Sequence, residues 1–239
     1  AGAVVVDHRL QAGSDEVAAK AAAQCQGLGL TARVLTGQAV PGEAGARALR
    51  YALLDTVEGT VLLGHTRDDQ AETVLLGLVR GSGARALSGM AAVRGRYRRP
   101  LLDVARATTR QACQEAGLDP WEDPHNEDPS YTRVRIRRLL AELPVDGLAR
   151  TARLLREDAD ALDALARPDD DVHRLLALPA ALRSRAIKLW AEQQSGVAVT
   201  SAHVDALRAL VEDWRGQGPV ALPGGGRVAR LEGRLAFTP

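Results

Sequence analysis

The stretch Thr60-Val-Leu-Leu-Gly-His-Thr-Arg-Asp-Asp-Gln-Ala-Glu-Thr73 joins a short apolar run to a cluster of polar and charged residues. Its first four residues predict a buried strand that Gly64 ends, and a helix is expected to begin near Asp68 and to run to Arg80. The polar cluster therefore stands at a strand-to-helix junction, which is where open α/β folds bind their ligands.

The residues before this stretch repeat the same pattern of strand and helix. Asp7 and His8 end the first predicted strand, so they are expected at the same edge of a parallel sheet as His65 and Asp69. Strands that alternate with helices predict an α/β fold with a parallel, doubly wound sheet. The predicted strands are Ala3–Val6, Thr31–Leu35 and Thr60–Leu63, and the predicted helices begin at Ser14, Glu43 and Asp68.

The pattern changes after Gly81. A loop-rich stretch is expected up to Leu102, then a helix over Ala105–Ala116 and a loop that contains three prolines. The chain becomes helical after Pro144 and ends in a short hairpin around Gly224–Gly226. We therefore expect an α/β domain at 1–144, a helical linker at 145–170 and a small helical accessory domain with a hairpin at 171–239.

The composition is that of an ordinary globular protein. The 239 residues are 46% hydrophobic and 26% charged, and no apolar run reaches the roughly 18–20 residues that a membrane span needs. The first residues also lack the basic region of a signal peptide. We therefore expect neither a membrane protein nor a secreted one. The net charge of +1 gives no overall attraction to nucleic acid, although every basic residue except Lys20 and Lys188 is an arginine, which suits phosphate and base edges.

The two cysteines argue for a reducing compartment. Cys25 and Cys113 lie far apart in Ala-rich stretches, and neither belongs to a Cys-x-x-Cys pair. A disulfide framework or a zinc site is therefore not expected, and a cytoplasmic location fits. We interpret both as small core residues, with a redox or sulfur-carrying role as the alternative.

The cluster from His65 to Thr73 admits a structural and a functional interpretation. Asp68 can cap the helix while Asp69 and Glu72 complement the helix dipole. Alternatively, the same carboxylates form a magnesium or nucleotide site together with His65. A metallohydrolase would need further histidines at ligand spacing, and none lies nearby in the sequence.

Two further clusters could bind anions. Arg133, Arg135, Arg137 and Arg138 follow an Asx-rich loop, and they form either a solvated helix face or a compact site for phosphates or an acidic substrate. Arg133 and Arg137 share one face of the predicted helix, whereas Arg135 points elsewhere. The segment Arg80-Gly-Ser-Gly83 could cradle a phosphate with its backbone amides, but its spacing alone is a weak signal.

Taken together, these motifs resemble the tRNA(Ile)-lysidine synthetases, which belong to the PP-loop ATP pyrophosphatases. The resemblance covers about residues 3–143 in the family's order, and the long motif from His65 to Thr73 is specific. The residues that carry it are Val5-Val-Asp-His8, Ala46-Arg-Ala-Leu-Arg-Tyr51, Leu63–Val74, Arg80–Gly83, Gly89-Met90, Arg99–Leu102 and 121–137. The helical tail and the Leu222-Pro-Gly-Gly hairpin are similar to the family's accessory region.

The resemblance implies a fold like that of the adenine-nucleotide α-hydrolases and an ATP- and magnesium-dependent ligase. Such an enzyme adenylates the wobble cytidine of a tRNA(Ile) with a CAU anticodon, and free L-lysine then displaces AMP to form lysidine. No membrane partner is expected, and a homodimer stays open as the oligomeric state.

Site residues are assigned on this resemblance in three groups. The catalytic group is His65, Asp68, Asp69 and Glu72, with Asp69 also the ligand for magnesium. The ATP-binding group is Asp7, His8, Arg80, Gly81, Ser82 and Gly83. The group that binds tRNA or lysine is Arg99, Asp123, Asn126, Arg133, Arg135 and Arg137.

One feature of the family has no counterpart in residues 1–239. The phosphate-binding loop Ser-Gly-Gly-x-Asp-Ser precedes the strand that ends in Asp7-His8, so we expect this sequence to be part of a longer chain and to be inactive alone. The alternatives are a non-catalytic RNA-binding module derived from the same family and an enzyme like the tRNA 2-thiocytidine synthetases. The second is disfavoured because those enzymes use Cys-x-x-Cys pairs.

Overall fold

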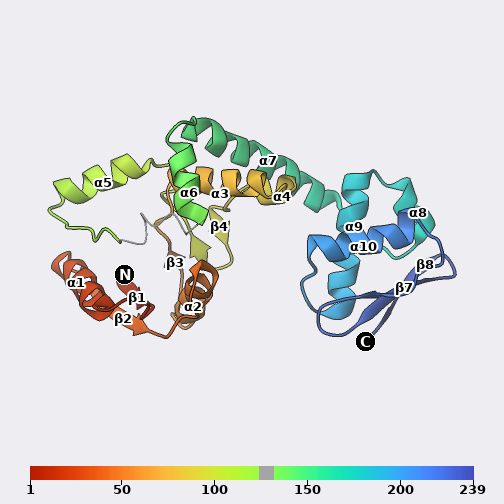
Figure 1. Cartoon of the computed structure of the whole chain (residues 1–239), viewed down its shortest axis with the longest axis horizontal. Coiled ribbons are helices and arrows are strands. Elements are labelled where there is room, and N and C mark those ends of the chain that lie inside the picture. Colours follow the sequence, from red (N-terminus) through yellow and green to blue (C-terminus); the bar gives the residue numbers. More distant parts are fainter. Residues whose placement is uncertain (124–131) are drawn as a thin grey trace. The chain divides into compact units, whose positions relative to one another are not determined.

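The computed structural model describes residues 1–123 and 132–239, which form two compact units, Ala1–Arg156 and Glu157–Pro239 (Figure 1). No helix within these two ranges combines the length and the apolar character that a membrane span requires. The helices of the first unit are α1 (Ser14–Gly27), α2 (Glu43–Asp55), α3 (Arg67–Val79), α4 (Ala84–Leu87), α5 (Arg106–Glu115) and α6 (Thr132–Leu140). Its strands are β1 (Gly2–Asp7), β2 (Thr31–Thr36), β3 (Val61–Leu62), β4 (Val93–Arg94) and β5 (Tyr97–Arg98).

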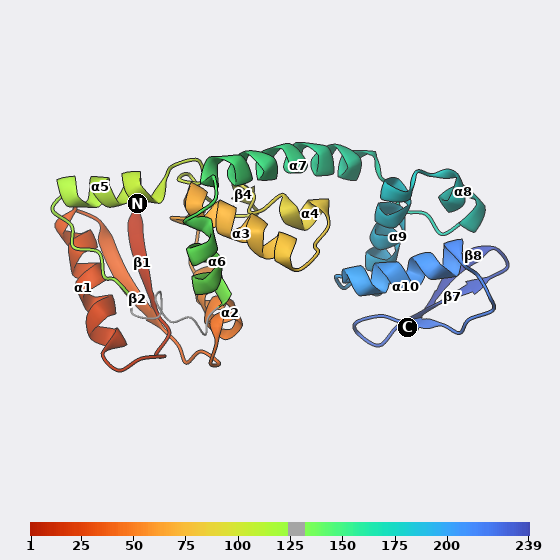
Figure 2. The ribbon, with the colours of Figure 1, turned by 45° about the horizontal axis from the view of Figure 1, so that its top comes forward.

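Strands β1 and β2 form a parallel pair, with Val5 opposite Val34, and α1 connects them (Figure 2). The β-branched run Val4–Val6 favours the extended backbone of β1. At its end, the buried Asp7 accepts hydrogen bonds from the Arg9 backbone N–H at 3.0 Å and the Ser14 hydroxyl at 2.7 Å. These bonds fix the end of the strand against the start of α1.

The stretch from Gly81 to Leu102 is more ordered than the sequence predicted. It contains α4 and an antiparallel hairpin of β4 and β5, and β5 also pairs in parallel with β3. Helix α2 packs against the hairpin. The Tyr97 ring of β5 lies edge-on to the Tyr51 ring of α2, with 5.1 Å between the ring centres, and the Tyr97 hydroxyl donates to Asp55 at the end of α2. The described strands of this unit therefore lie in two separate sheets rather than in the single sheet expected.

Helix α3 lies beside α6 and carries the polar motif that opens it (Figure 2). Ala71 of α3 packs with Ile136 and Leu140 of α6 in a small buried cluster. On another side of α3, the Gln70 amide clamps Met90 by accepting from its N–H at 2.7 Å and donating to its carbonyl at 3.0 Å. Gly89 has a φ of +63°, and a Cβ there would lie 2.5 Å from the Gln70 oxygen, so this close approach requires glycine.

Helix α7 (Val145–Leu165) runs from the first unit into the second. The second unit has its own core, in which Leu175, Ile187, Leu207 and Leu210 are fully buried. Its other elements are α8 (Val172–Ala177), α9 (Ala180–Ser195), α10 (Ser201–Glu212), β6 (Val220–Ala221), β7 (Arg227–Leu231) and β8 (Arg234–Thr238).

The C-terminal strands form a three-stranded antiparallel sheet, not the simple hairpin predicted around Gly224–Gly226. The tighter turn joins β7 to β8 at Glu232 and Gly233, which both have positive φ, as a two-residue hairpin turn requires. Glycine is also needed at Gly226, where a Cβ would lie 2.3 Å from the Phe237 ring. The predicted fold class, an α/β region followed by helices and a small β element, is confirmed.

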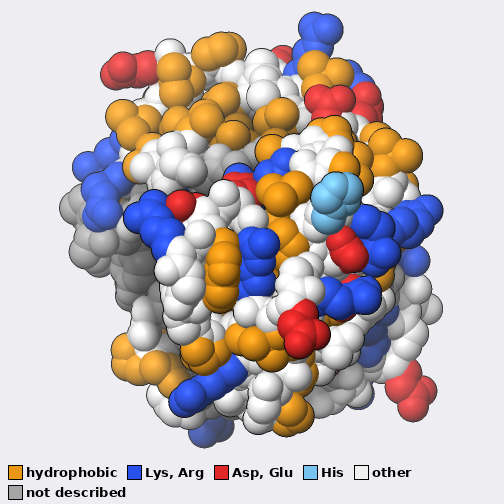
Figure 3. All heavy atoms as spheres, turned by 90° about the vertical axis from the view of Figure 1, so that its right-hand side faces the viewer, with side chains coloured by type: hydrophobic (Ala, Val, Ile, Leu, Met, Phe, Trp, Pro, Cys, Tyr) orange, Lys and Arg blue, Asp and Glu red, His pale blue; other side chains and the backbone are white. Residues whose placement is uncertain are grey.

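Charged side chains of the second unit are mostly paired with each other. Arg183 and Arg208 both bond to Glu212, and Arg174 bonds to Asp169 at 2.7 Å, which lowers the pKa of Asp169 to about 2. On the face of the molecule that Figure 3 shows, basic and acidic side chains are interspersed and do not gather into a patch of one sign. This agrees with the near-neutral net charge of the whole sequence.

Candidate active site

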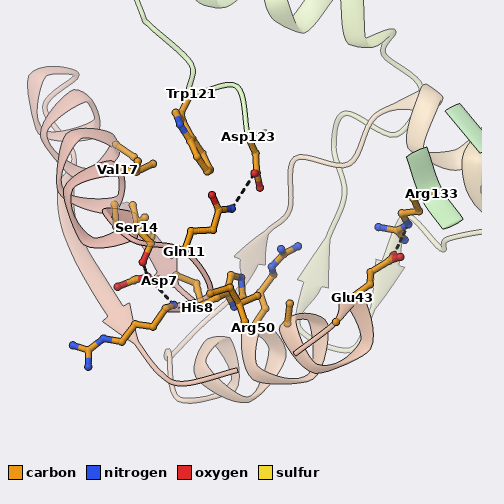
Figure 4. A pocket seen from close by; sticks show the side chains of 18 of the residues that line it. Asp7, His8, Gln11, Ser14, Val17, Glu43, Arg50, Trp121, Asp123 and Arg133 are labelled. Atoms are coloured by element: carbon orange, nitrogen blue, oxygen red, sulfur yellow. Dashed lines mark hydrogen bonds and ion pairs between the residues drawn. The ribbon is translucent and has the colours of Figure 1, made fainter. Parts of the chain in front are cut away.

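A cavity of about 580 Å³ lies in the first unit, at the carboxyl end of β1 (Figure 4). Segments that are far apart in the sequence meet there, as expected for a parallel α/β fold. It is lined from β1, α1, α2, the start of α3, the segment before residue 124 and α6. The polar lining residues include Asp7, His8, Gln11, Ser14, Glu43, Arg50, His65, Asp69, Asp123, Arg133 and Arg137.

Two histidines face this cavity in the neutral form. The Nδ1 atoms of His8 and His65 are buried and have no hydrogen-bond partner within the described structure. Burial lowers the pKa of both rings, and nearby cations lower it further, mainly Arg50 for His8 and Arg99 for His65. The lowered pKa favours the neutral form of both rings, in which one ring nitrogen carries no proton.

Three arginines give the cavity a positive wall. Arg133 forms an ion pair with Glu43 at 2.8 Å, and Arg137 bonds to Glu72. For Arg50, the described residues provide no carboxylate partner, and burial together with Arg47 and Arg133 lowers its pKa. A cation at the cavity wall that has no carboxylate partner among the described residues is well suited to bind an anion that enters the cavity.

The start of α3 is built around Asp69. Its Oδ2 accepts from the backbone N–H of Thr66 at 2.7 Å and from the Thr66 hydroxyl at 2.8 Å, which completes a capping box. Its Oδ1 accepts from Arg106 at 2.8 Å. Burial raises the pKa of Asp69, but the Thr66 hydrogen bonds and Arg106 outweigh it, so the pKa is lowered and the side chain is ionised.

Behind the cavity wall, Glu72 connects two arginines. Only 3% of its side chain is exposed, and its Oε1 accepts from Arg106 at 2.8 Å and from Arg137 at 2.6 Å. Arg106 therefore joins Asp69 to Glu72, and Glu72 joins Arg106 to Arg137. We call these four residues the Asp69–Arg137 network.

Comparisons with known proteins point to one family. Residues 1–143 match the PP-loop domain and residues 171–236 match the TilS substrate binding domain. The tRNA(Ile)-lysidine synthase of Leifsonia xyli is 48% identical, and the match covers 100% of this chain and 81% of that protein. The chain belongs to the tRNA(Ile)-lysidine synthase family.

Other members of the tRNA(Ile)-lysidine synthase family are similarly close. The protein from Rhodococcus erythropolis is 49% identical over 96% of this chain and 78% of its own length, and that from Streptomyces coelicolor is 46% identical over 99% and 76%. Among solved structures, the U34-tRNA thiolase NcsA from Methanococcus maripaludis aligns with a TM-score of 0.49 and 14% identity, over 64% of this chain and 61% of that one.

For this member of the lysidine synthase family, the structure brings together about half of the residues that the sequence singled out. Those that line the cavity are Asp7, His8, His65, Asp69, Asp123, Arg133 and Arg137. Glu72 lies just behind them. Asp68 instead accepts from the backbone N–H of Arg106 at 2.7 Å, where α5 begins.

The remaining predicted residues lie elsewhere or outside the described residues. Arg99 is 4% exposed, does not line the cavity, and donates to the Ala91 carbonyl at 2.7 Å. Arg135 donates to Thr132 at 3.1 Å and does not line the cavity. Asn126 falls within residues 124–131 and so lies outside the described residues.

The segment Arg80–Gly83 lies at the C-terminal end of α3 and does not line the cavity. The backbone amides of Arg80 and Ser82 donate to the Gly77 carbonyl, and that of Gly81 donates to Leu78. These three amides therefore close the helix end, and the proposed phosphate cradle would have to form without them.

Three residues that matter in the structure were not assigned a role from the sequence. Arg106 bonds to both carboxylates of the Asp69–Arg137 network, Arg50 is a cation without a carboxylate partner in the part of the chain that the structure describes, and Trp121 forms part of the cavity wall. For Arg106, no local pattern marks an arginine at a helix start as the partner of carboxylates more than 30 residues earlier. Arg50 and Trp121 lie in the motifs that carry the family resemblance, which was the available signal.

Magnesium does not fit the predicted ligand Asp69 as that side chain stands. Both of its oxygens already accept hydrogen bonds, from Thr66 and from Arg106. Within residues 1–123 and 132–239, no group of three or more His, Cys, Asp or Glu side chains could hold a metal ion. A magnesium ion that uses few protein ligands takes most of its oxygens from phosphates and water.

Proposed function

We propose that this protein ligates L-lysine to carbon 2 of the wobble cytidine of a tRNA(Ile) with a CAU anticodon, using ATP. Its membership of the tRNA(Ile)-lysidine synthase family carries the proposal. The cavity supports it, because neutral histidines, an ionised aspartate and Arg50, which has no carboxylate partner among the described residues, face one space large enough for a nucleotide.

The first chemical step joins the cytidine to AMP. The carbonyl oxygen at carbon 2 attacks the α-phosphorus of ATP, an O–P bond forms, and the bond to the β-phosphate breaks to release pyrophosphate. Negative charge is spread over the phosphate oxygens during this transfer, and Arg50 and Arg133 are placed to stabilise it. Magnesium would supply further positive charge to the phosphates, and it would not depend on Asp69, whose oxygens accept from Thr66 and Arg106.

The second step joins lysine to the activated base. The lysine amine attacks carbon 2, a C–N bond forms, and the C–O bond to AMP breaks. The attacking amine must lose a proton, and the unpartnered Nδ1 of His65 is a suitable acceptor because the ring is neutral. Arg133 or Arg137 can bind the lysine carboxylate or an RNA phosphate.

The reaction itself tests the proposal. The intact protein is incubated with ATP, L-lysine and a tRNA(Ile) transcript with the CAU anticodon, and nucleosides are analysed by mass spectrometry. Lysidine should form together with equal amounts of AMP and pyrophosphate, and it should not form without lysine. If ATP and tRNA bind but no nucleoside is modified, the RNA-binding module becomes the better interpretation.

Replacing Arg50 with alanine should weaken ATP binding about 10-fold to 100-fold, because a charge-assisted hydrogen bond contributes about 1.5–3 kcal/mol. The measurement is the Kd for ATP by isothermal titration calorimetry. Arg33→Ala is the matched control, since Arg33 is an exposed arginine of β2 that does not line the cavity. Equal affinities for the two variants would remove Arg50 from the anion site.

Replacing Arg133 with alanine should weaken tRNA binding and make it less dependent on salt. Each phosphate contact on single-stranded RNA contributes about −0.7 to the slope of log K against log salt. Removing one contact should therefore flatten the slope by about that amount in a filter-binding series. Glu43→Gln frees Arg133 from its ion pair without removing the cation, so it should not flatten the slope. An unchanged affinity and slope for Arg133→Ala would assign Arg133 to lysine binding or to structure.

A further inference from the structure

Trp121 is held across one end of the cavity although half of its side chain is in contact with solvent. It is 51% exposed, and its ring lines the 580 Å³ cavity together with Val17 of α1 (Figure 4). It also lines a second, smaller cavity of about 220 Å³ between α1 and the residues around Leu118. An exposed indole at a cavity wall is costly to leave in water, so its fixed position calls for an explanation.

The segment that carries Trp121 is fastened on both sides of this residue. Asp119 forms an ion pair with Lys20 at 2.6 Å, and its backbone N–H and carbonyl both bond to the Gln24 side chain, at 2.9 and 3.0 Å. On the other side, Asp123 accepts from the Gln11 amide at 3.1 Å, and Glu122 accepts twice from Arg110. These bonds tie the segment to α1 and α5, so the indole is presented in a defined place.

The two ends of the cavity differ in their charged groups. Near Trp121 the wall carries apolar side chains of α1, among them Val17, with Gln11 and Asp123 beside the indole. Arg133 and Glu43 lie across the cavity from it, with Arg50 between the two ends (Figure 4). A nucleotide has the same polarity, with a flat base at one end and phosphates at the other. Its phosphates would therefore lie toward the arginines and its base toward Trp121.

We propose that Trp121 is the platform on which the adenine of ATP stacks, an inference that rests on the proposed function. Adenine is favoured over the cytidine because His65 and Asp69, which the proposed function assigns to the reaction at the cytidine, belong to the strand-to-helix junction that opens α3, whereas the Trp121 segment is tied to α1 and α5. The two fused rings of a purine also cover an indole more completely than a pyrimidine does. The Gln11 amide and the Asp123 carboxylate lie next to the indole as polar groups for the edge of the base (Figure 4).

Calorimetry with Trp121→Ala tests this assignment. The Kd for ATP should rise about 10-fold to 100-fold, the effect of losing one base–aromatic stack, and Trp121→Phe should stay within about threefold of the wild type because phenylalanine still stacks. Trp214→Ala is the matched control, since Trp214 is 40% exposed and belongs to the second unit. Its affinity for ATP should not change, and circular dichroism should show all three variants folded.

Fluorescence gives a second readout that does not depend on catalysis. Trp121 is the one tryptophan of the first unit, the other two being Trp190 and Trp214. ATP should quench the emission of the wild type, and Trp121→Phe should bind ATP without that change. An unchanged Kd for Trp121→Ala would overturn the platform, as would a defect confined to tRNA binding, which would place the cytidine on the indole. Either result leaves the proposed function standing as long as the wild type forms lysidine.

Discussion

Asp69→Asn is expected to slow lysidine formation about 100-fold or more in a single-turnover assay with the complete enzyme. The carboxylate faces the cavity and holds Arg106 at 2.8 Å, while Thr66 occupies its other oxygen. The asparagine side chain carries no charge to attract Arg106. Its NH₂ group is a donor, and it would face Thr66 or Arg106, which donate to the aspartate in the wild type. Each factor of ten in rate corresponds to about 1.4 kcal/mol of lost transition-state stabilisation.

The competing explanation makes a different prediction for the same variant. If Asp69 only caps α3 and complements its dipole, the substitution should cost about 0.3–2 kcal/mol of stability and leave the rate nearly unchanged. Asp15→Asn is the control, because Asp15 is an exposed acidic residue in the first turn of α1 and does not line the cavity. A rate within about threefold of the wild type would leave Asp69 as a helix-start residue.

Glu72→Ala is expected to lower the free energy of unfolding of the first unit by about 2–3 kcal/mol. Removing one partner of a buried ion pair costs about 3–5 kcal/mol, and this figure is reduced here because Arg106 and Arg137 are each 31% exposed and keep contact with water. Arg106 keeps Asp69 as a partner, which limits the loss further. Urea denaturation followed by circular dichroism measures the change.

Glu122→Ala is the matched control for this experiment. Glu122 also bonds to an arginine at 2.7 Å, but both side chains are more than half exposed. Exposed pairs contribute little, so a loss below about 1 kcal/mol is expected. If the two variants lose the same amount, burial of Glu72 does not determine the strength of the network.

The network also explains why the α3 motif is so dense in charge. Buried carboxylates are unfavourable unless cations and hydrogen-bond donors surround them. Arg106 and Arg137 come from α5 and α6, so these helices are fixed against α3 by the same bonds that orient Asp69 toward the cavity. Positioning of the site and stability of the unit are therefore coupled, and variants here should affect both.

The local elements followed directly from the sequence, because their signals act over a few residues. The valine run of β1, the acidic residues Asp68 and Asp69 and the apolar run before Gly64 predicted strands and helix starts to within a few residues. The predicted cap Asp68 was wrong, because Thr66 caps α3 and Asp69 completes the capping box. The sequence analysis missed the hairpin of β4 and β5, because each of these strands has only two residues. The hairpin is stabilised by contacts with Tyr51 and Asp55 of α2. Such distant packing leaves no periodic pattern in the hairpin itself.

The sequence by itself determined the fold class and the family. It also predicted that the polar residues at the strand ends lie close together, because short motifs at strand ends converge at one edge of a parallel sheet. Only the tertiary structure decided which side chains share the cavity. It placed Arg50 in the cavity wall and Arg106 behind it, bonded to Asp69, and it kept Arg80–Gly83 and Arg135 out of the lining. The physical reason is that ion pairs and cavity walls join residues from different helices, whose relative orientation depends on packing of the whole unit rather than on local sequence.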